Sequence, residues 1–345
     1  MDTNSETYLV IRFSSLGNVA MLVPVLASVA KARPKAKFVV LTQSRFADMF
    51  FGMDNVEVYP AERSGKSGKR KSALRLFKEV SSRYKVTHVF DLQRDMHSNM
   101  LDVLFAVSGI RVTRIETDRL LQWRLLRNGY SRSEQLPTEF ERYGDAFMSA
   151  GLGWSREFAS LQENRVARAS LEKRFGEKQC RWLGIAPFAK SKTNMLPYSI
   201  TKAVIAHYAS EANVRVFLFG AGRVECEMLG QWAERYENVT SVAGQLRLSE
   251  ELELMRKLDL MLGMDSANQH LASLVGLRCL TVWCGTHPFS GFYGWKQREE
   301  DIIQQPLSCR PCTVHGKNRC KYYNYLCRQE SPAKIIDRMA ELLKL

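Results

Sequence analysis

Apolar segments of strand length alternate with segments of helical periodicity, and this alternation occurs twice along the chain. Strand-like segments of the first half lie at 8–13, 38–41, 56–58 and 86–92. Those of the second half lie at 182–186, 214–219, 239–242, 258–262 and 279–283. Strands separated by helices pair in parallel through right-handed crossovers. The sequence therefore predicts an α/β protein made of two doubly wound, Rossmann-like domains.

The length of 345 residues also favours two domains over a single core. We expect an N-terminal domain at 1–165 and a C-terminal domain at 178–330, joined by a charged connection. A final amphipathic helix at 331–345 could pack back on the N-terminal domain. Ligands of doubly wound sheets bind at the carboxyl ends of the strands, so the loops that follow the strands are the candidate site.

The chain carries a formal net charge of +14, which favours anionic partners. Part of this charge lies at 63–71 and part at 111–132. No recognisable nucleic-acid module accompanies it, so no nucleic-acid partner is expected. No apolar run reaches the roughly 20 residues of a membrane span, and the first residues lack the basic start of a signal peptide. We therefore expect a cytoplasmic protein.

Two loops carry glycines that would let the backbone approach a ligand. The first joins the first strand to its helix and contains Ser14, Ser15 and Gly17. The second follows the strand at 214–219 and contains Gly220, with Glu225 where a dinucleotide fingerprint would have its third glycine. A nicotinamide cofactor is therefore not expected, and Glu225 could accept hydrogen bonds from a ribose or remain a surface carboxylate.

The segment 263–276 is the most informative loop. Asp265 and Ser266 close a strand, and a helix bearing Ala267 and His270 begins directly after them. The start of a helix presents free amides and a partial positive charge, as a pyrophosphate site requires. The alternative is simple capping of the helix by these side chains.

Two further loops end strands of the same sheet. Gly285, Thr286 and His287 follow the strand at 279–283. Lys190 and Lys192 follow the strand at 182–186 and could stabilise the charge of a departing diphosphate.

These motifs together resemble glycosyltransferase family nine, the ADP-heptose:lipopolysaccharide heptosyltransferases. The resemblance rests on Asp-Ser-x-x-x-His-Leu-Ala at 265–272, Gly-Thr-His-Pro at 285–288 and Arg-Phe-Ser-Ser-Leu-Gly at 12–17. Glu-Arg-Tyr at 141–143 and the Cys-x-x-Cys at 309–312 occur in the same order. The resemblance implies a GT-B fold, with two domains facing each other across a cleft and the nucleotide sugar in the C-terminal one. It also implies inverting transfer of heptose from ADP-heptose to the lipopolysaccharide inner core, without a catalytic metal. The acceptor would be a lipid-linked anionic saccharide, and the basic N-terminal loops could lie against the inner face of the membrane.

Three positions depart from the family pattern. Asn18 stands where the family has an aspartate that takes the proton of the acceptor hydroxyl, and an amide cannot be a general base. Asn194 stands where a lysine faces the diphosphate, although Lys190 or Lys192 could reach it. Ala267 replaces a glycine. Asp95 or His97 could supply a replacement base.

Two functions follow from these residues. One is an active sugar transferase, and the other is a relative that binds a nucleotide sugar or a saccharide without transferring it. A nucleic-acid-binding role, resting on charge alone, is a distant third.

Four cysteines cluster near the end of the chain, at Cys309, Cys312, Cys320 and Cys327. Disulfides are disfavoured in a reducing compartment, and neighbouring thiolates are typical of zinc sites. We therefore expect either a structural zinc ion or four free thiols.

Overall fold

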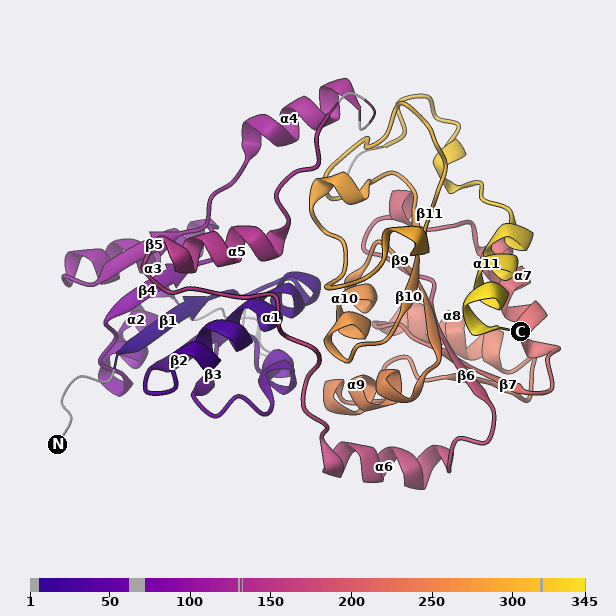
Figure 1. Ribbon diagram of the computed structural model, residues 1–345, viewed down its shortest axis with the longest axis horizontal. Coiled ribbons are helices and arrows are strands. Elements are labelled where there is room, and N and C mark those ends of the chain that lie inside the picture. Colours follow the sequence, from indigo (N-terminus) through magenta and orange to yellow (C-terminus); the bar gives the residue numbers. More distant parts are fainter. Residues whose placement is uncertain (1–5, 62–71, 130, 132, 317–318, 345) are drawn as a thin grey trace. The chain divides into compact units, whose positions relative to one another are not determined.

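The computed structural model describes residues 6–61, 72–129, 131, 133–316 and 319–344. The chain divides into two compact units (Figure 1). The first comprises Met1–Thr117 and Glu139–Gln162, and the second comprises Asp118–Thr138 and Glu163–Leu345. Residues 118–138 cluster with the second unit, although the sequence analysis placed them in the N-terminal domain at 1–165. None of the helices in the described ranges is long and apolar enough to cross a membrane.

The first unit is built on a parallel sheet in the order β3-β2-β1-β4-β5. Its strands are β1 (Thr7–Ile11), β2 (Lys37–Thr42), β3 (Val56–Pro60), β4 (His88–Asp91) and β5 (Arg111–Arg114). The central strands β1 and β2 are buried except at Lys37, because helices cover both faces of such a sheet. β2 and β3 extend the sheet on one side of β1, and β4 and β5 extend it on the other. The loops after β1 and β4 therefore lie at a topological switch point.

Helices enclose this sheet through their apolar faces. α2 (Ala73–Arg83) and α3 (Met96–Val107) pack together over the core formed by residues such as Leu9 and Val39. α1 (Leu16–Ala32) packs against α5 (Glu139–Met148) and the short helix η1 (Ser44–Phe50). α5 therefore returns to the first unit after the excursion of residues 118–138 into the second.

The second unit repeats the pattern in a parallel sheet of order β11-β10-β9-β6-β7-β8. Its strands are β6 (Arg181–Ala186), β7 (Val214–Leu218), β8 (Val239–Ser241), β9 (Leu260–Met264), β10 (Cys279–Trp283) and β11 (Ile302–Gln304). The switch point lies between β6 and β9, and the loop after β10 lies beside it.

Helices cover both faces of the second sheet (Figure 1). α7 (Tyr198–Ala209), α8 (Arg223–Ala233) and α11 (Pro332–Leu343) lie on one side. α6 (Arg165–Phe175), α9 (Leu248–Lys257) and α10 (Ala267–Leu274) lie on the other. α4 (Arg119–Asn128) also belongs to this unit, within the excursion of residues 118–138.

The C-terminal helix α11 is part of the second unit, and the suggested return to the N-terminal domain does not describe it. Ile335, Met339 and Leu343 are buried in the core of the second unit, where α11 packs against α7. These residues recur at helical spacing, as the sequence predicted, and their apolar face had to be covered by some core.

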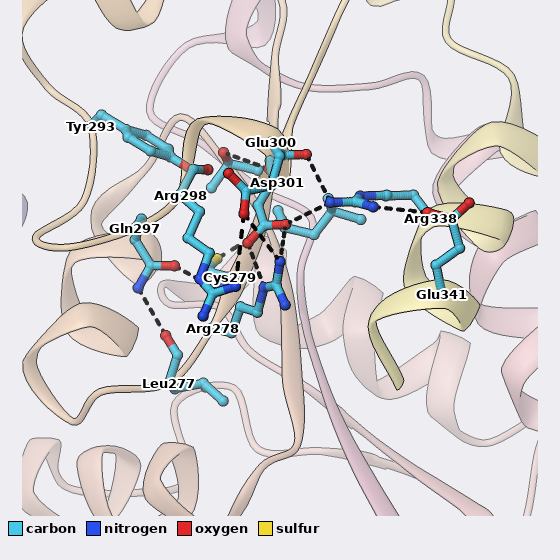
Figure 2. A network of polar contacts seen from close by, with 12 residues as sticks. Leu277, Arg278, Cys279, Tyr293, Gln297, Arg298, Glu300, Asp301, Arg338 and Glu341 are labelled. Carbon is cyan, nitrogen blue, oxygen red and sulfur yellow. Dashed lines mark hydrogen bonds and ion pairs between the residues drawn. The ribbon is translucent and has the colours of Figure 1, made fainter. Parts of the chain in front are cut away.

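A polar network fixes the same helix to the edge of the sheet (Figure 2). Asp301 is fully buried just before β11 and accepts hydrogen bonds from Arg278 at 2.6 and 2.9 Å and from Arg338 of α11 at 3.2 Å. Gln297 adds a bond from the backbone N–H of Cys279 and donates to the carbonyl of Leu277. Two guanidinium groups thus neutralise one buried carboxylate beside the amino ends of β10 and β11.

Candidate functional site

Asp265 is the centre of a side-chain network at the carboxyl edge of the second sheet. It follows β9, and its Oδ2 accepts a hydrogen bond from Asn194 Nδ2 at 3.0 Å and one from Thr286 Oγ1 at 2.6 Å. Burial raises the pKa of the Asp265 carboxyl to about 6, while Thr286 and the charge of Arg310 act in the opposite direction. The structure therefore brings the loops after β6, β9 and β10 together, as the sequence predicted.

Asn194 is buried, with 5% of its surface exposed, and its amide is committed to Asp265. Contact between Asn194 and a diphosphate stays a prediction. Lys190 and Lys192 of the same loop are exposed instead, and neither forms an ion pair with any part of the chain that the structure describes. Both ammonium groups are therefore available to a ligand of this loop.

Close backbone contact explains the glycine at position 285. The Gly285 N–H donates to the Thr193 carbonyl at 2.9 Å, and a Cβ at position 285 would lie 3.1 Å from that oxygen. The Gly285 carbonyl in turn accepts from the N–H of Cys312 at 2.9 Å. The segment 309–316 is thereby joined to the loops after β6 and β10.

Arg310 is the residue of this site that sequence reasoning missed. Its side chain is fully buried, and its guanidinium donates to the carbonyls of Trp283, Cys284, Thr286 and Gln305. Arginine has five N–H donors in a fixed geometry, which suits the gathering of several carbonyls. A charged residue in a cysteine-rich loop gives no sequence signal of such burial.

The start of α10 presents polar atoms that lack protein partners. Ser266 is the N-cap residue, yet its side chain makes no capping hydrogen bond. Ser266 Oγ and His270 Nδ1 are both buried without a hydrogen-bond partner among the described residues. Simple capping by Ser266 is therefore ruled out, and these atoms, with the amides of the helix start at Ala267, can serve a ligand.

The two histidines of this edge are neutral. Burial lowers the pKa of His270 to about 4, and burial together with the charge of Arg310 lowers the pKa of His287 to about 4. His287 Nδ1 accepts a hydrogen bond from the Phe289 N–H at 3.1 Å, so its proton is on Nε2. Both rings can therefore form hydrogen bonds with a ligand without adding charge.

Gly220 and Glu225 lie after β7, at the same edge of the sheet. Glu225 Oε2 accepts the N–H of Ala221 at 2.9 Å, so this carboxylate closes its own loop. No hydrogen bond within the described ranges joins this loop to Asp265 and its partners. Binding of a ribose by Glu225 stays a prediction.

In the first unit, the loop containing Ser14, Ser15 and Gly17 is anchored to both neighbouring strands. Gln43, after β2, donates to the Phe13 carbonyl at 2.7 Å. Gln93, after β4, accepts the N–H of Ser14 at 3.2 Å. The loops after β1 and β4 are therefore in direct contact at the switch point.

Asn18 lies in the first turn of α1 and is partly exposed. The hydroxyl of Tyr143 donates to the Asn18 carbonyl at 3.1 Å, while the Asn18 side chain makes no hydrogen bond with the described residues. Buried ion pairs join Glu139 of α5 to Arg12 at 3.3 Å and to Arg142 at 3.2 Å. The Glu-Arg-Tyr motif thus marks a helix that supports the first loop, and sequence reasoning missed the part played by Glu139.

The structure describes all four C-terminal cysteines, and none of them forms a disulfide. Across the described residues, no group of three or more His, Cys, Asp or Glu side chains could hold a metal ion. Backbone N–H groups of residues 322–325 lower the pKa of the Cys320 thiol, against the effect of its partial burial. Structural zinc stays a prediction.

Of the two basic segments of the sequence, the one at 63–71 lies outside the described residues. The other, at 111–132, includes the arginines of α4.

Two Rossmann-like units, each with small-residue loops at the carboxyl edge of its sheet, define the GT-B class of fold. The family model of glycosyltransferase family 9 (heptosyltransferase) matches residues 73–323. The chain therefore belongs to glycosyltransferase family 9.

Solved structures are similar in fold over the whole chain. A family 9 glycosyltransferase from Veillonella parvula has a TM-score of 0.75 at 16% identity, covering 100% of this chain and 99% of its own. The E. coli ADP-heptose lipopolysaccharide heptosyltransferase II has a TM-score of 0.70 at 16% identity, covering 98% of each chain. E. coli heptosyltransferase WaaC with ADP has a TM-score of 0.66 at 17% identity, covering 97% of this chain and 99% of its own. No curated protein matches the sequence.

Proposed function

We propose that the protein transfers a heptose, or a related sugar, from ADP-heptose to a lipopolysaccharide core acceptor with inversion at the sugar carbon. Family membership supports the transfer of a sugar, and two structures of similar fold are described as a heptosyltransferase bound to ADP and an ADP-heptose lipopolysaccharide heptosyltransferase. The observation that carries the proposal is the Asp265 network, because it holds three strand-end loops around the start of α10.

The second unit binds the donor. Ser266, His270 and the amides at Ala267 contact the diphosphate, while Lys190 and Lys192 neutralise its charge as it leaves. Thr286 and His287 line the same edge, and Glu225 with Gly220 holds the ribose. The unpartnered atoms Ser266 Oγ and His270 Nδ1 support these assignments.

The first unit binds the acceptor through the loop of Ser14, Ser15 and Gly17. Asn18 occupies the position of the family's base, so a second candidate function is binding of a nucleotide sugar without transfer. The two functions differ in what Asn18→Asp does. If Asn18 only slows a working site, Asn18→Asp raises turnover of ADP-heptose at least about tenfold, because a carboxylate can accept the proton. Equal, negligible turnover in both proteins would support the binding function.

α4 binds the membrane in which the lipid part of the acceptor is held. Leu125 anchors the helix with none of its surface exposed, whereas Leu120 and Trp123 are 60% and 52% exposed. Arg119, Arg124 and Arg127 are exposed as well, and α4 contains no acidic residue. Leucine and tryptophan side chains insert at the boundary between headgroups and acyl chains, while arginines bind anionic headgroups. The occupant of this surface is an anionic membrane.

Vesicle sedimentation tests this assignment. The double variant Leu120→Ser/Trp123→Ser should bind vesicles of phosphatidylethanolamine and phosphatidylglycerol at least about tenfold more weakly than the unmodified protein, because buried apolar area drives insertion. Val224→Ser, which changes a residue 61% exposed on α8, is the matched control and should bind normally. Unchanged binding of the double variant would show that α4 does not contribute to membrane binding.

A further inference from the structure

The outer face of α3 is apolar from one end of the helix to the other. Its exposed apolar side chains recur at intervals of four, three and four residues, which places them in one line along the helix. They are Met96, Met100, Val103 and Val107, with 80%, 54%, 56% and 84% of their surfaces exposed. Asn99 is the one polar side chain among the exposed residues of α3, a helix that the structure describes in full. We call this line of four residues the α3 stripe.

The opposite face of α3 attaches the helix to its unit without help from the stripe. Leu101 and Phe105 are buried in the core of the first unit, where α3 packs against α2. Asp102, the acidic residue of the helix, is fully buried and pairs with Arg114 of β5 at 2.7 Å. A surface helix ordinarily turns charged residues to water, so a continuous apolar stripe in their place indicates a binding surface.

An exposed arginine lies at each end of the α3 stripe. Arg94 precedes the helix, and Arg111 begins β5, which packs against α3. Arg94 donates one N–H to the Ile115 carbonyl at 2.8 Å, a bond that leaves its charge in place. Neither arginine forms an ion pair with another described residue. The carboxylate of Asp95 is turned to the start of the helix, where it accepts two backbone N–H groups.

Charge decides between the two partners that such a stripe can have. A second copy of the chain would carry the same formal charge of +14, and two such molecules repel each other. A helix of 12 residues also offers little of the roughly 1,000 Å² that a stable protein interface buries. An anionic membrane attracts this charge, takes up apolar side chains at its acyl chains and binds arginines at its headgroups.

We propose that the α3 stripe inserts into the surface of an anionic membrane, with Arg94 and Arg111 at the headgroups. The inference rests on the proposed function, because a lipid-linked acceptor is what brings the enzyme to a membrane. α3 begins in the loop after β4, which contacts the acceptor loop through the bond between Ser14 N–H and Gln93 Oε1. Insertion of α3 thus brings the acceptor loop to the membrane surface, and this step involves the first unit alone.

Sedimentation with vesicles of phosphatidylethanolamine and phosphatidylglycerol tests the proposal. Met96→Gln/Val107→Thr gives polar residues of similar shape to the two most exposed positions of the stripe. This stripe variant should raise the apparent Kd for the vesicles at least about fivefold, because buried apolar area drives insertion. Met148→Gln/Val166→Thr is the matched control, with the same exchanges at positions 56% and 76% exposed on α5 and α6, and should bind normally.

Two further measurements separate the contributions to binding. The stripe variant should weaken binding in the background of Leu120→Ser/Trp123→Ser as well, since α3 and α4 belong to different units. Arg94→Gln/Arg111→Gln should weaken binding about fivefold at low salt and by less at high salt, because salt screens exposed charges. Its binding to vesicles of neutral phosphatidylcholine should equal that of the unmodified protein.

Normal vesicle binding by the stripe variant would overturn the proposal, and so would an equal loss in its matched control. A dimer of the unmodified protein in analytical ultracentrifugation that the stripe variant abolishes would also overturn it, because a second copy would then cover the stripe. The transfer itself is followed separately, as ADP release from ADP-heptose with a deacylated, heptose-deficient lipopolysaccharide core, and the stripe variant should be fully active with this soluble acceptor. No ADP release by the unmodified protein would refute the transfer, whereas weaker vesicle binding by the stripe variant would still support membrane insertion of α3.

Discussion

The two units share one strand order, yet the loops at their carboxyl edges are held in different ways. In the second unit side chains meet side chains, with Asp265 joining Asn194 and Thr286 from two other loops. In the first unit the loop after β1 is held through its backbone, by Gln43, Gln93 and Tyr143. The side chains at the carboxyl edge of the second sheet therefore depend on one another for their hydrogen bonds. The side chain at position 18 can change without loss of the hydrogen bond that Tyr143 donates to its backbone.

This difference determines what a substitution costs at each edge. Replacing a residue such as Asp265 would leave the buried amide of Asn194 and the hydroxyl of Thr286 without a partner, which costs stability as well as function. Replacing the residue at 18 alters chemistry alone. A substitution of Asp265 is consequently harder to accommodate than one of Asn18.

The largest expected effect concerns the side-chain network that supports the second unit. Asp301→Ala leaves Arg278 and Arg338 without their shared buried carboxylate, and should lower the free energy of unfolding by about 3 kcal/mol. Chemical denaturation followed by tryptophan fluorescence measures it, because five of the six tryptophans belong to the second unit. Asp337→Ala, at an exposed position of α11, should change it by less than about 0.5 kcal/mol. Equal stability of the two variants would break the comparison.

An intermediate effect is expected at the free charges of the donor edge. Lys190→Ala/Lys192→Ala should raise the Kd for ADP by about tenfold at low salt, and by less at high salt, because exposed charges are screened. Calorimetric titration gives the value. The matched control, Lys85→Ala/Lys173→Ala, removes two exposed lysines elsewhere and should leave the Kd unchanged. A normal Kd in the first variant would mean that the diphosphate binds through α10 alone.

The smallest effect concerns a buried carboxyl of the first unit. Burial, together with the neighbouring Asp91, raises the pKa of Asp102 to about 7. A carboxyl whose folded pKa lies above its unfolded value of about 3.9 contributes stability that is fully present below about pH 4 and is lost as the pH rises toward 7. Asp102→Asn removes this titration while keeping a polar group beside Asp91 and Arg114.

The stability of Asp102→Asn relative to the unmodified protein should therefore be more favourable at pH 8 than at pH 5, by on the order of 1 kcal/mol. Thermal unfolding at the two pH values measures this difference. Asp145→Asn, at an exposed position of α5, should show no such change. The same pH dependence in both variants would show that Asp102 is ionised throughout.

Long apolar segments made most of the fold predictable, and short polar ones did not. The strands at 38–41, 214–219 and 279–283 were found from their apolar runs, and the match to the structure is within a residue or two. The edge strand β5 reads Arg-Val-Thr-Arg and pairs only with β4, so no apolar run marks it. α4 was missed because three arginines interrupt its leucines and Leu125 alone is buried.

The site was predictable to the level of loops but not of atoms. Parallel strands bring their carboxyl ends to one edge, so the residues after β6, β9 and β10 could be grouped from the sequence. The commitment of Asn194 to Asp265, and the burial of Arg310 among carbonyls, depend on contacts between segments more than 20 residues apart. No local pattern encodes such contacts.

The central claim, that the second unit binds a sugar nucleotide through the Asp265 edge, is tested most directly by calorimetric titration of the unmodified protein with ADP. We expect one site per chain, with a Kd that Asp265→Ala weakens at least about tenfold by leaving Asn194 and Thr286 unpaired. Absence of heat with ADP, together with salt-sensitive binding to RNA, would contradict the account and assign the excess of positive charge to nucleic acid instead.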